Sequence, residues 1–335
     1  TLWSFMVNLA YGVTTARDPQ SMDINIFTYA DRVAVGDMIG PRVFTTGPGI
    51  FNNSPVNNLE DAKRIVQKYS EYYRVNTVKQ YLSGNRRHRQ LLNMAIQDAQ
   101  LIPTTEGMDM KLMVTQIMDG YSLEHTLPHY PLYKDMIELI VQSGTYYDPT
   151  VIVGTGPRAE YYYWTRTDVH GNKKLNHFFP HDILDLQTRR VPWFHESEFS
   201  YKEYAKTFKN IVNAGGKIGV GSHGEMQGIC YHWELWNIQS GGMSEMDALR
   251  CATIIGSEAI GFSNDLGSIE EGKLADLILL TKNPLDDIRN TNSIKYVMKN
   301  GILYDADSLD EVWPTIKKLP PQYWHGKTPK HHDKY

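Results

Sequence analysis

Four polar side chains stand at or near the ends of predicted β-strands, in an order that suits metal chemistry. Lys79 lies inside "TVKQY", Glu106 ends "IPTTEG", His125 ends "YSLEH" and His223 ends "IGVGSH". Imidazole and carboxylate groups are common ligands of zinc, and zinc lowers the pKa of bound water to about 7. Each residue alone is more often an ordinary surface or packing group. Together they predict a site for one or two divalent metal ions, zinc first, that hydrolyses its substrate with metal-activated water.

The segments around these residues alternate between strand and helix patterns. Strand-like runs include "AYGVTTARD", "PRVFTTGPG" and "VNTVKQYLSG". Helix-like runs include "LEDAKRIVQKYSEYY", which Asn58 precedes as an N-cap, and "SEMDALRCATIIGSEAIG", which Ser244 with Asp247 begins in the manner of a capping box. About seven strand–helix units follow one another, which is typical of a parallel α/β architecture. We therefore predict a TIM-like (β/α)8 barrel that lacks its first strand, in which the strand ends meet at one face. A doubly wound open sheet is the alternative, and no Gly-x-Gly-x-x-Gly follows a strand to support its nucleotide-binding form.

Changes in composition and residue pattern at three places along the chain predict how it divides into domains. The barrel is expected over residues 1–262, with an insertion at about 156–194 that is rich in tyrosine, histidine and charge. This insertion is too long for a barrel connection, which predicts a functional loop or lid, with a surface excursion as the alternative. Residues 263–306 are expected to form a small β-unit, because Asn300-Gly301 between apolar runs indicates a hairpin. Residues 307–335 are expected to be a loosely ordered C-terminal tail.

Composition narrows the class of partner. The formal net charge is −4, and the sequence has no basic block other than the short cluster at 86–89, so no nucleic-acid partner is expected. No apolar run is long enough to span a bilayer, so no membrane partner is expected. Two cysteines make no disulfide framework and leave the compartment open, with periplasm or secretion among the options. The chain opens inside a helix pattern without Met, from which we expect a fragment of a longer protein.

Beyond these patterns, the sequence resembles the amidohydrolase superfamily, in particular its imidazolonepropionase- and prolidase-like branch. The resemblance rests on "GVTTARD", "VKQYLSG", "GYSLEH", "IGVGSHG" and above all "MSEMDALRCATIIGSEAIGFSNDLGSIEEGKLADLILL". It spans nearly the whole chain. Through "NPLDDIRNTNSIKYVMKNGILYDADSLDEVWP" it also resembles the amidohydrolase part of proteins with an upstream TolB-like β-propeller.

The resemblance implies a metal-dependent hydrolase of C–N bonds, such as cyclic or dipeptide-like amides. It implies that Lys79 is carboxylated and bridges two metal ions, and that His125 is a metal ligand. Glu106 and His223 fall where most members have a histidine ligand and a catalytic aspartate, so His223 is expected to serve as ligand or base. Glu225 is a reserve candidate for the base. The His-x-His pair of the first strand is absent from the sequence, which predicts weak metal retention by this chain.

Two further residues are candidates for substrate binding. Arg17 follows "GVTTA" and is suited to anchor a substrate carboxylate, while a structural ion pair is an equally good interpretation. Tyr81 is two residues past Lys79 and therefore points to the same side of its strand, where it either bonds substrate or packs. His232 is a reserve ligand.

Several alternatives for the function stay open. The barrel is either an enzyme, or a catalytically degenerate binding module of a propeller fusion protein, or a hydrolase of lactones or phosphotriesters. The expected partners are a small-molecule substrate, an upstream propeller domain in the parent chain and a second copy of the chain. The sequence indicates neither the substrate nor the metal count.

Overall fold

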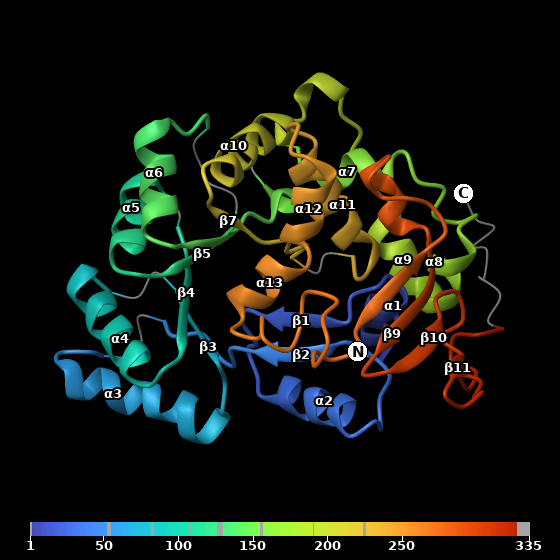
Figure 1. Ribbon diagram of the computed structural model, residues 1–335, viewed down its shortest axis with the longest axis horizontal. Coiled ribbons are helices and arrows are strands. Elements are labelled where there is room, and N and C mark those ends of the chain that lie inside the picture. Colours follow the sequence, from blue (N-terminus) through green and yellow to red (C-terminus); the bar gives the residue numbers. More distant parts are fainter. Residues whose placement is uncertain are drawn as a thin grey trace.

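The protein is described here by a computed structural model (Figure 1). The structure describes residues 2–51, 55–81, 84–107, 109–125, 130–154, 157–189, 191–223 and 226–326. The predicted site residues lie within these ranges, apart from the reserve base Glu225, which lies outside the described residues.

In the part of the chain that the structure describes, seven parallel strands follow one another in chain order. They are β1 (Thr15–Asp18), β2 (Arg42–Thr45), β3 (Thr77–Gln80), β4 (Ile102–Glu106), β5 (Ser122–Glu124), β6 (Tyr146–Asp148) and β7 (Lys217–Ile218). The first two form one sheet and the other five form a second, each strand pairing with the next. Ile50, which follows β2 in the chain, forms an isolated parallel bridge to Gln80 of β3. The α/β class and the parallel order are confirmed, whereas closure of the strands into a barrel stays a prediction.

Helices precede, separate and follow these strands. They are α1 (Leu2–Ala10), α2 (Asn25–Ala34), α3 (Leu59–Gln67) with its π-helical continuation Lys68–Tyr73, α4 (Arg86–Asp98), α5 (Met110–Met118), α6 (Lys134–Gln142), α10 (Tyr201–Asn213), α11 (Ile229–Gln239), α12 (Glu245–Cys251) and α13 (Ile254–Ala259). Four of those described here, α3, α4, α5 and α12, begin with a side-chain N-cap. The side chains of Asn58 and Ser244 accept hydrogen bonds from Asp61 and Asp247, as the sequence predicts. Helices α3 to α6 line the outer side of β3, β4 and β5 (Figure 1).

The insertion differs from the loop or lid that the sequence predicts. It contains three helices, α7 (Ala159–Trp164), α8 (Lys173–Phe178) and α9 (His181–Thr188). Its apolar side chains belong to the same core as α1 and α11, for example through stacking of Tyr163 on Trp233 with ring centroids 5.2 Å apart. Burial of these aromatic side chains makes the insertion a structural part of the fold.

The C-terminal part adds a four-stranded antiparallel sheet. Its strands are β8 (Leu277–Leu280), β9 (Ile294–Lys299), β10 (Ile302–Asp305) and β11 (Glu311–Trp313), in the order β11-β10-β9-β8. Asn300 and Gly301 turn between β9 and β10 with positive φ angles of 55° and 76°, which confirms the hairpin. Part of the tail is also fixed, because Trp324 is buried and its Nε1 donates to the His177 carbonyl. The domain boundaries themselves stay predictions.

Three short 3₁₀ helices complete the described elements. They are η2 (Val151–Val153), η3 (Glu196–Glu198) and η4 (Ile288–Asn292). In the part of the chain that the structure describes, no helix combines the length and the apolar character needed to cross a membrane.

Candidate functional site

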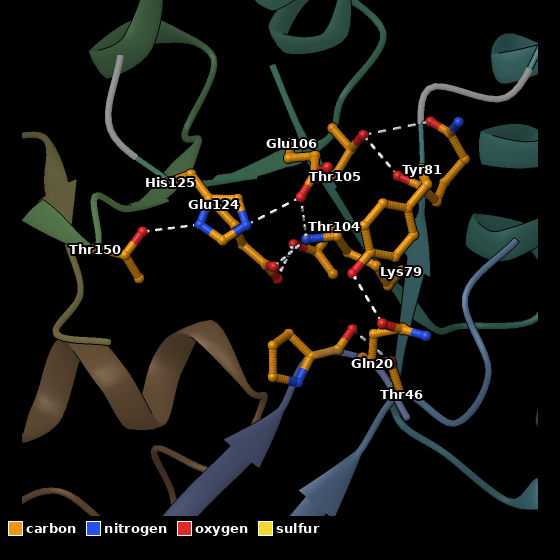
Figure 2. A network of polar contacts seen from close by, with 12 residues as sticks. Gln20, Thr46, Lys79, Tyr81, Thr104, Thr105, Glu106, Glu124, His125 and Thr150 are labelled. Carbon is orange, nitrogen blue, oxygen red and sulfur yellow. Dashed lines mark hydrogen bonds and ion pairs between the residues drawn. The ribbon is translucent and has the colours of Figure 1, made fainter. Parts of the chain in front are cut away.

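Lys79 occupies the centre of a polar cluster at the carboxyl ends of β3, β4 and β5 (Figure 2). Its side chain is 1% exposed. The Nζ atom forms an ion pair with Glu124 and lies 3.5 Å from Oε2 of Glu106. A buried ammonium group is tolerated when carboxylates neutralise it, and Glu124 and Glu106 offer that compensation to Lys79.

Glu106 and His125 meet on the other side of this lysine. Nε2 of His125 is 2.9 Å from Oε2 of Glu106, and Nδ1 of His125 is 2.9 Å from Oγ1 of Thr150. Burial raises the pKa of Glu106, but the hydrogen bond from His125 and the charge on Lys79 outweigh burial and leave this pKa below its usual value. The strands therefore bring three of the four predicted strand-end residues together.

Glu124, which sequence reasoning did not select, is the most heavily bonded carboxylate of the cluster. It accepts a 2.7 Å hydrogen bond from Thr104 and forms a 2.9 Å ion pair with Arg17, besides its contact with Lys79. Burial raises the pKa of Glu124, but the charges on Arg17 and Lys79 reverse the effect, so the pKa lies below its usual value. Its position directly before His125 was the available signal.

The two predicted substrate-binding residues have different surroundings. Arg17 is bound to Glu124, which is the structural ion pair that the sequence left as an alternative to a substrate anchor. Tyr81 points to the same side as Lys79, whose Nζ lies 4.7 Å from the ring centroid. Its ring also stacks on Phe51, with centroids 4.7 Å apart, and its hydroxyl donates to Gln20 at 3.3 Å. Their roles toward substrate stay predictions.

His223 lies near the cluster but outside its hydrogen-bonded centre. It is exposed, it follows the end of β7 by five residues, and its ring centroid is 5.3 Å from that of His125. Its φ of 60° is left-handed, as are those of His125 (72°) and Thr150 (44°). Positive φ is uncommon outside glycine, so three such residues around one cluster indicate a locally constrained backbone.

Asp148, at the end of β6, is a second acidic residue that the sequence reasoning missed. Its Oδ1 is buried and makes no hydrogen bond to the described residues. Burial raises the pKa of this carboxyl, and the charge on Arg17 partly offsets the rise. A Cβ atom on Gly221 would clash with this carboxylate, so the glycine at 221 makes room for Asp148. The same strand-end rule that selected Glu106 applies to Asp148.

Metal-binding capability is limited to a few side chains of the cluster. Among the described residues, no group of three His, Cys, Asp or Glu side chains is placed to hold a metal ion. Glu106 and His125 have the carboxylate and imidazole chemistry that zinc accepts. Lys79 as an ammonium group cannot bind a cation, and only a carboxylated Lys79 would add oxygen donors beside them. By donor chemistry these three residues fit a divalent ion, with His223 as the nearest further imidazole.

The reserve histidine His232 has a structural role. It is 3% exposed, its Nε2 contacts the Tyr11 carbonyl at 2.9 Å, and its Nδ1 contacts Thr291 at 3.1 Å. Burial lowers its pKa to about 4, so the ring is neutral at physiological pH. These bonds tie α11 to α1 and to η4 and account for both ring nitrogens.

Several solved structures resemble this chain in fold. The chain matches a Xaa-Pro dipeptidase with methionine bound in its active site at a TM-score of 0.67 and 22% identity, covering 90% of this chain and 77% of that one. It matches molinate hydrolase at a TM-score of 0.70 and 17% identity, covering 96% and 78%. These matches support an α/β fold of the TIM-barrel type.

The family follows from the sequence match. A model of the amidohydrolase family matches residues 114–303, which is more than half of the chain. The chain therefore belongs to the amidohydrolase family. Ochratoxinase of Aspergillus niger is 29% identical over 110 residues, a segment that covers 32% of this chain and 23% of ochratoxinase. The aligned segment thus spans about a quarter of that relative's length.

Proposed function

We propose that this chain is the hydrolytic part of an enzyme that cleaves amide-type C–N bonds with the help of a divalent metal ion, zinc first. The family membership supports hydrolysis. The observation that carries the proposal is the convergence of Glu106 and His125 on Lys79 at the ends of three adjacent parallel strands (Figure 2). Ligand-capable groups at this face of such a fold are the usual components of an active site.

Lys79, in carboxylated form, would hold the metal ion together with Glu106 and His125. When bound, the ion supplies an acidified water and polarises the substrate carbonyl. Thr150 orients the His125 ring. Before carboxylation, Glu124 forms an ion pair with Lys79 and is itself held by Arg17. Tyr81 and Phe51 form an aromatic surface beside Lys79, against which an apolar part of a substrate can rest.

His223 is the residue that we assign to proton transfer. A neutral imidazole can accept a proton from an attacking water through its unprotonated ring nitrogen. Its exposed position at the edge of the cluster gives it access to both substrate and solvent.

The test combines metal content with turnover. Purified wild type, Lys79→Ala and His125→Ala are assayed for bound metal and for hydrolysis of amides, dipeptides and lactones, with zinc supplied in excess. Loss of turnover in both variants and preference for amides support the proposal. Unchanged metal content and turnover in both variants contradict it, and metal binding without turnover in the wild type favours the degenerate binding module.

A further inference from the structure

Glu234 is a fully buried glutamate of α11 that lies outside the cluster of Lys79, Glu106 and His125. Its side chain is 0% exposed. Oε1 accepts a hydrogen bond from the backbone N–H of Val151 and Oε2 from that of Ile152, both at 2.7 Å. A buried carboxyl that accepts two consecutive backbone N–H groups fixes the orientation of both peptide planes.

These two N–H groups immediately follow a strained residue. Thr150 has a φ of 44° and a ψ of 53°, in the left-handed region that β-branched residues strongly disfavour. Such a conformation persists only where surrounding contacts impose it. The contacts of Glu234 with the next two residues supply that constraint from a separate helix.

The strained residue in turn contacts the site. Oγ1 of Thr150 is 2.9 Å from Nδ1 of His125, whose Nε2 is 2.9 Å from Glu106. A hydroxyl can donate or accept, so Thr150 can serve either tautomer of the ring, provided that its backbone keeps Oγ1 in place. The chain of contacts runs from Glu234 through the N–H groups of η2 to Thr150 and then to His125.

We infer that Glu234 is a positioning residue, which holds Thr150 in its left-handed conformation and so fixes the ring orientation of His125. The inference rests on the proposed function only in assigning His125 to the active site. A residue of this kind acts through its effect on the orientation of a functional group, and loss of such a partner commonly lowers activity by about 10- to 100-fold.

The test follows the His125 ring directly. Glu234→Gln keeps the shape of the side chain but turns an amide NH₂ toward one backbone N–H, which removes one of the two hydrogen bonds. Protein labelled with ¹⁵N-histidine is measured by NMR as purified, with His125→Ala used for assignment. Glu160→Gln is the matched control, because Glu160 is also buried, at 6%, and lies on α7.

We expect Glu234→Gln to shift both ring nitrogens of His125, and Glu160→Gln to leave them unchanged. Thr150→Val should produce a shift of its own, and adding Glu234→Gln to it should change the ring little further. An unperturbed His125 ring in folded Glu234→Gln, or in Thr150→Val, overturns the inference. If Glu234→Gln does not fold, Glu234→Asp is measured instead, and an unchanged ring again overturns it.

Turnover gives a second and separable readout. We expect kcat to fall by about 10-fold in Glu234→Gln with KM changed less than two-fold, because the ring is misdirected while the substrate surface stays intact. The NMR experiment requires no turnover. Shifted His125 signals in a protein without turnover would therefore support the positioning role of Glu234 and contradict only the proposed function. An active protein whose His125 ring is unchanged in Glu234→Gln would contradict only the positioning role.

Discussion

Glu106 and His125 stand at the ends of neighbouring parallel strands, with Oε2 of one 2.9 Å from Nε2 of the other. Their contact places a carboxylate and an imidazole side by side above the buried ammonium group of Lys79. The pairing of β4 with β5 sets this geometry, because Glu106 is in register with Glu124, the residue before His125. The cluster is therefore a property of the sheet and does not depend on a long loop.

Removal of the lysine charge should destabilise the fold strongly. Lys79→Met leaves Glu124 with Arg17 as its remaining cation, and breaking a buried ion pair typically costs about 3–5 kcal/mol. The control is Lys63→Met, which removes the exposed pair with Asp98 and should cost less than about 1 kcal/mol. Urea unfolding at neutral pH measures both, and equal losses in the two variants would contradict the buried role of Lys79.

A methyl group at position 221 should act through Asp148. Gly221→Ala places a Cβ against the Asp148 carboxylate, and overpacking of this kind costs about 1–3 kcal/mol. Gly219→Ala is the control, because its Cβ would lie 3.8 Å from that of Asp148, an ordinary contact. Thermal unfolding should show a smaller penalty for Gly221→Ala in an Asp148→Ala background. An equal penalty in both backgrounds would assign the clash to another neighbour.

Acid should weaken the contribution of Glu124. The pKa of Glu124 is lowered in the folded state, because the charges of Arg17 and Lys79 outweigh the effect of burial. The stability that Glu124 contributes is therefore fully present above the unfolded-state pKa of about 4.3. This contribution is lost as the pH falls through the folded-state pKa. The difference in unfolding free energy between wild type and Glu124→Gln should therefore shrink below about pH 4. Urea titrations at several pH values test this, and a constant difference speaks against it.

Rising pH should lower the stability of the fold through Glu234, whereas Glu124 loses its stabilising effect when the pH falls. Burial raises its pKa to about 8, and the nearby Asp148 contributes to the rise. The folded state therefore binds its proton more tightly than the unfolded state, and stability falls as the pH rises from the unfolded-state value through about 8. Wild type should lose stability relative to Glu234→Gln between about pH 5 and pH 9. Parallel stability curves for the two proteins would exclude this titration.

The sequence was sufficient for the parts of the fold that repeat a local pattern. Strand–helix alternation, the caps at Asn58 and Ser244 and the hairpin at Asn300-Gly301 all depend on neighbouring residues, and each is confirmed. The convergence of Lys79, Glu106 and His125 followed from the rule that parallel strands end at one face.

The features that could not be predicted from the sequence depend on contacts between segments that are far apart in the chain. Nothing local in the insertion indicates that Tyr163 stacks on Trp233, so its place in the core could not be predicted. Glu234 lies on α11, a helix that is buried on most of its faces, far from Val151 in sequence, and its contact with Val151 follows only from helix packing. The partner of Arg17 was likewise open, because an arginine at a strand end suits both a substrate anion and a carboxylate such as Glu124.

The left-handed conformation of Thr150 opposes thermal stability to the orientation of His125. A β-branched residue in that conformation stores about 1–3 kcal/mol, which glycine or asparagine would release. Selection for survival at high temperature would therefore favour replacement at position 150. The same replacement would remove the hydroxyl at Nδ1 of His125, so a more robust chain would be obtained with a less well-oriented imidazole.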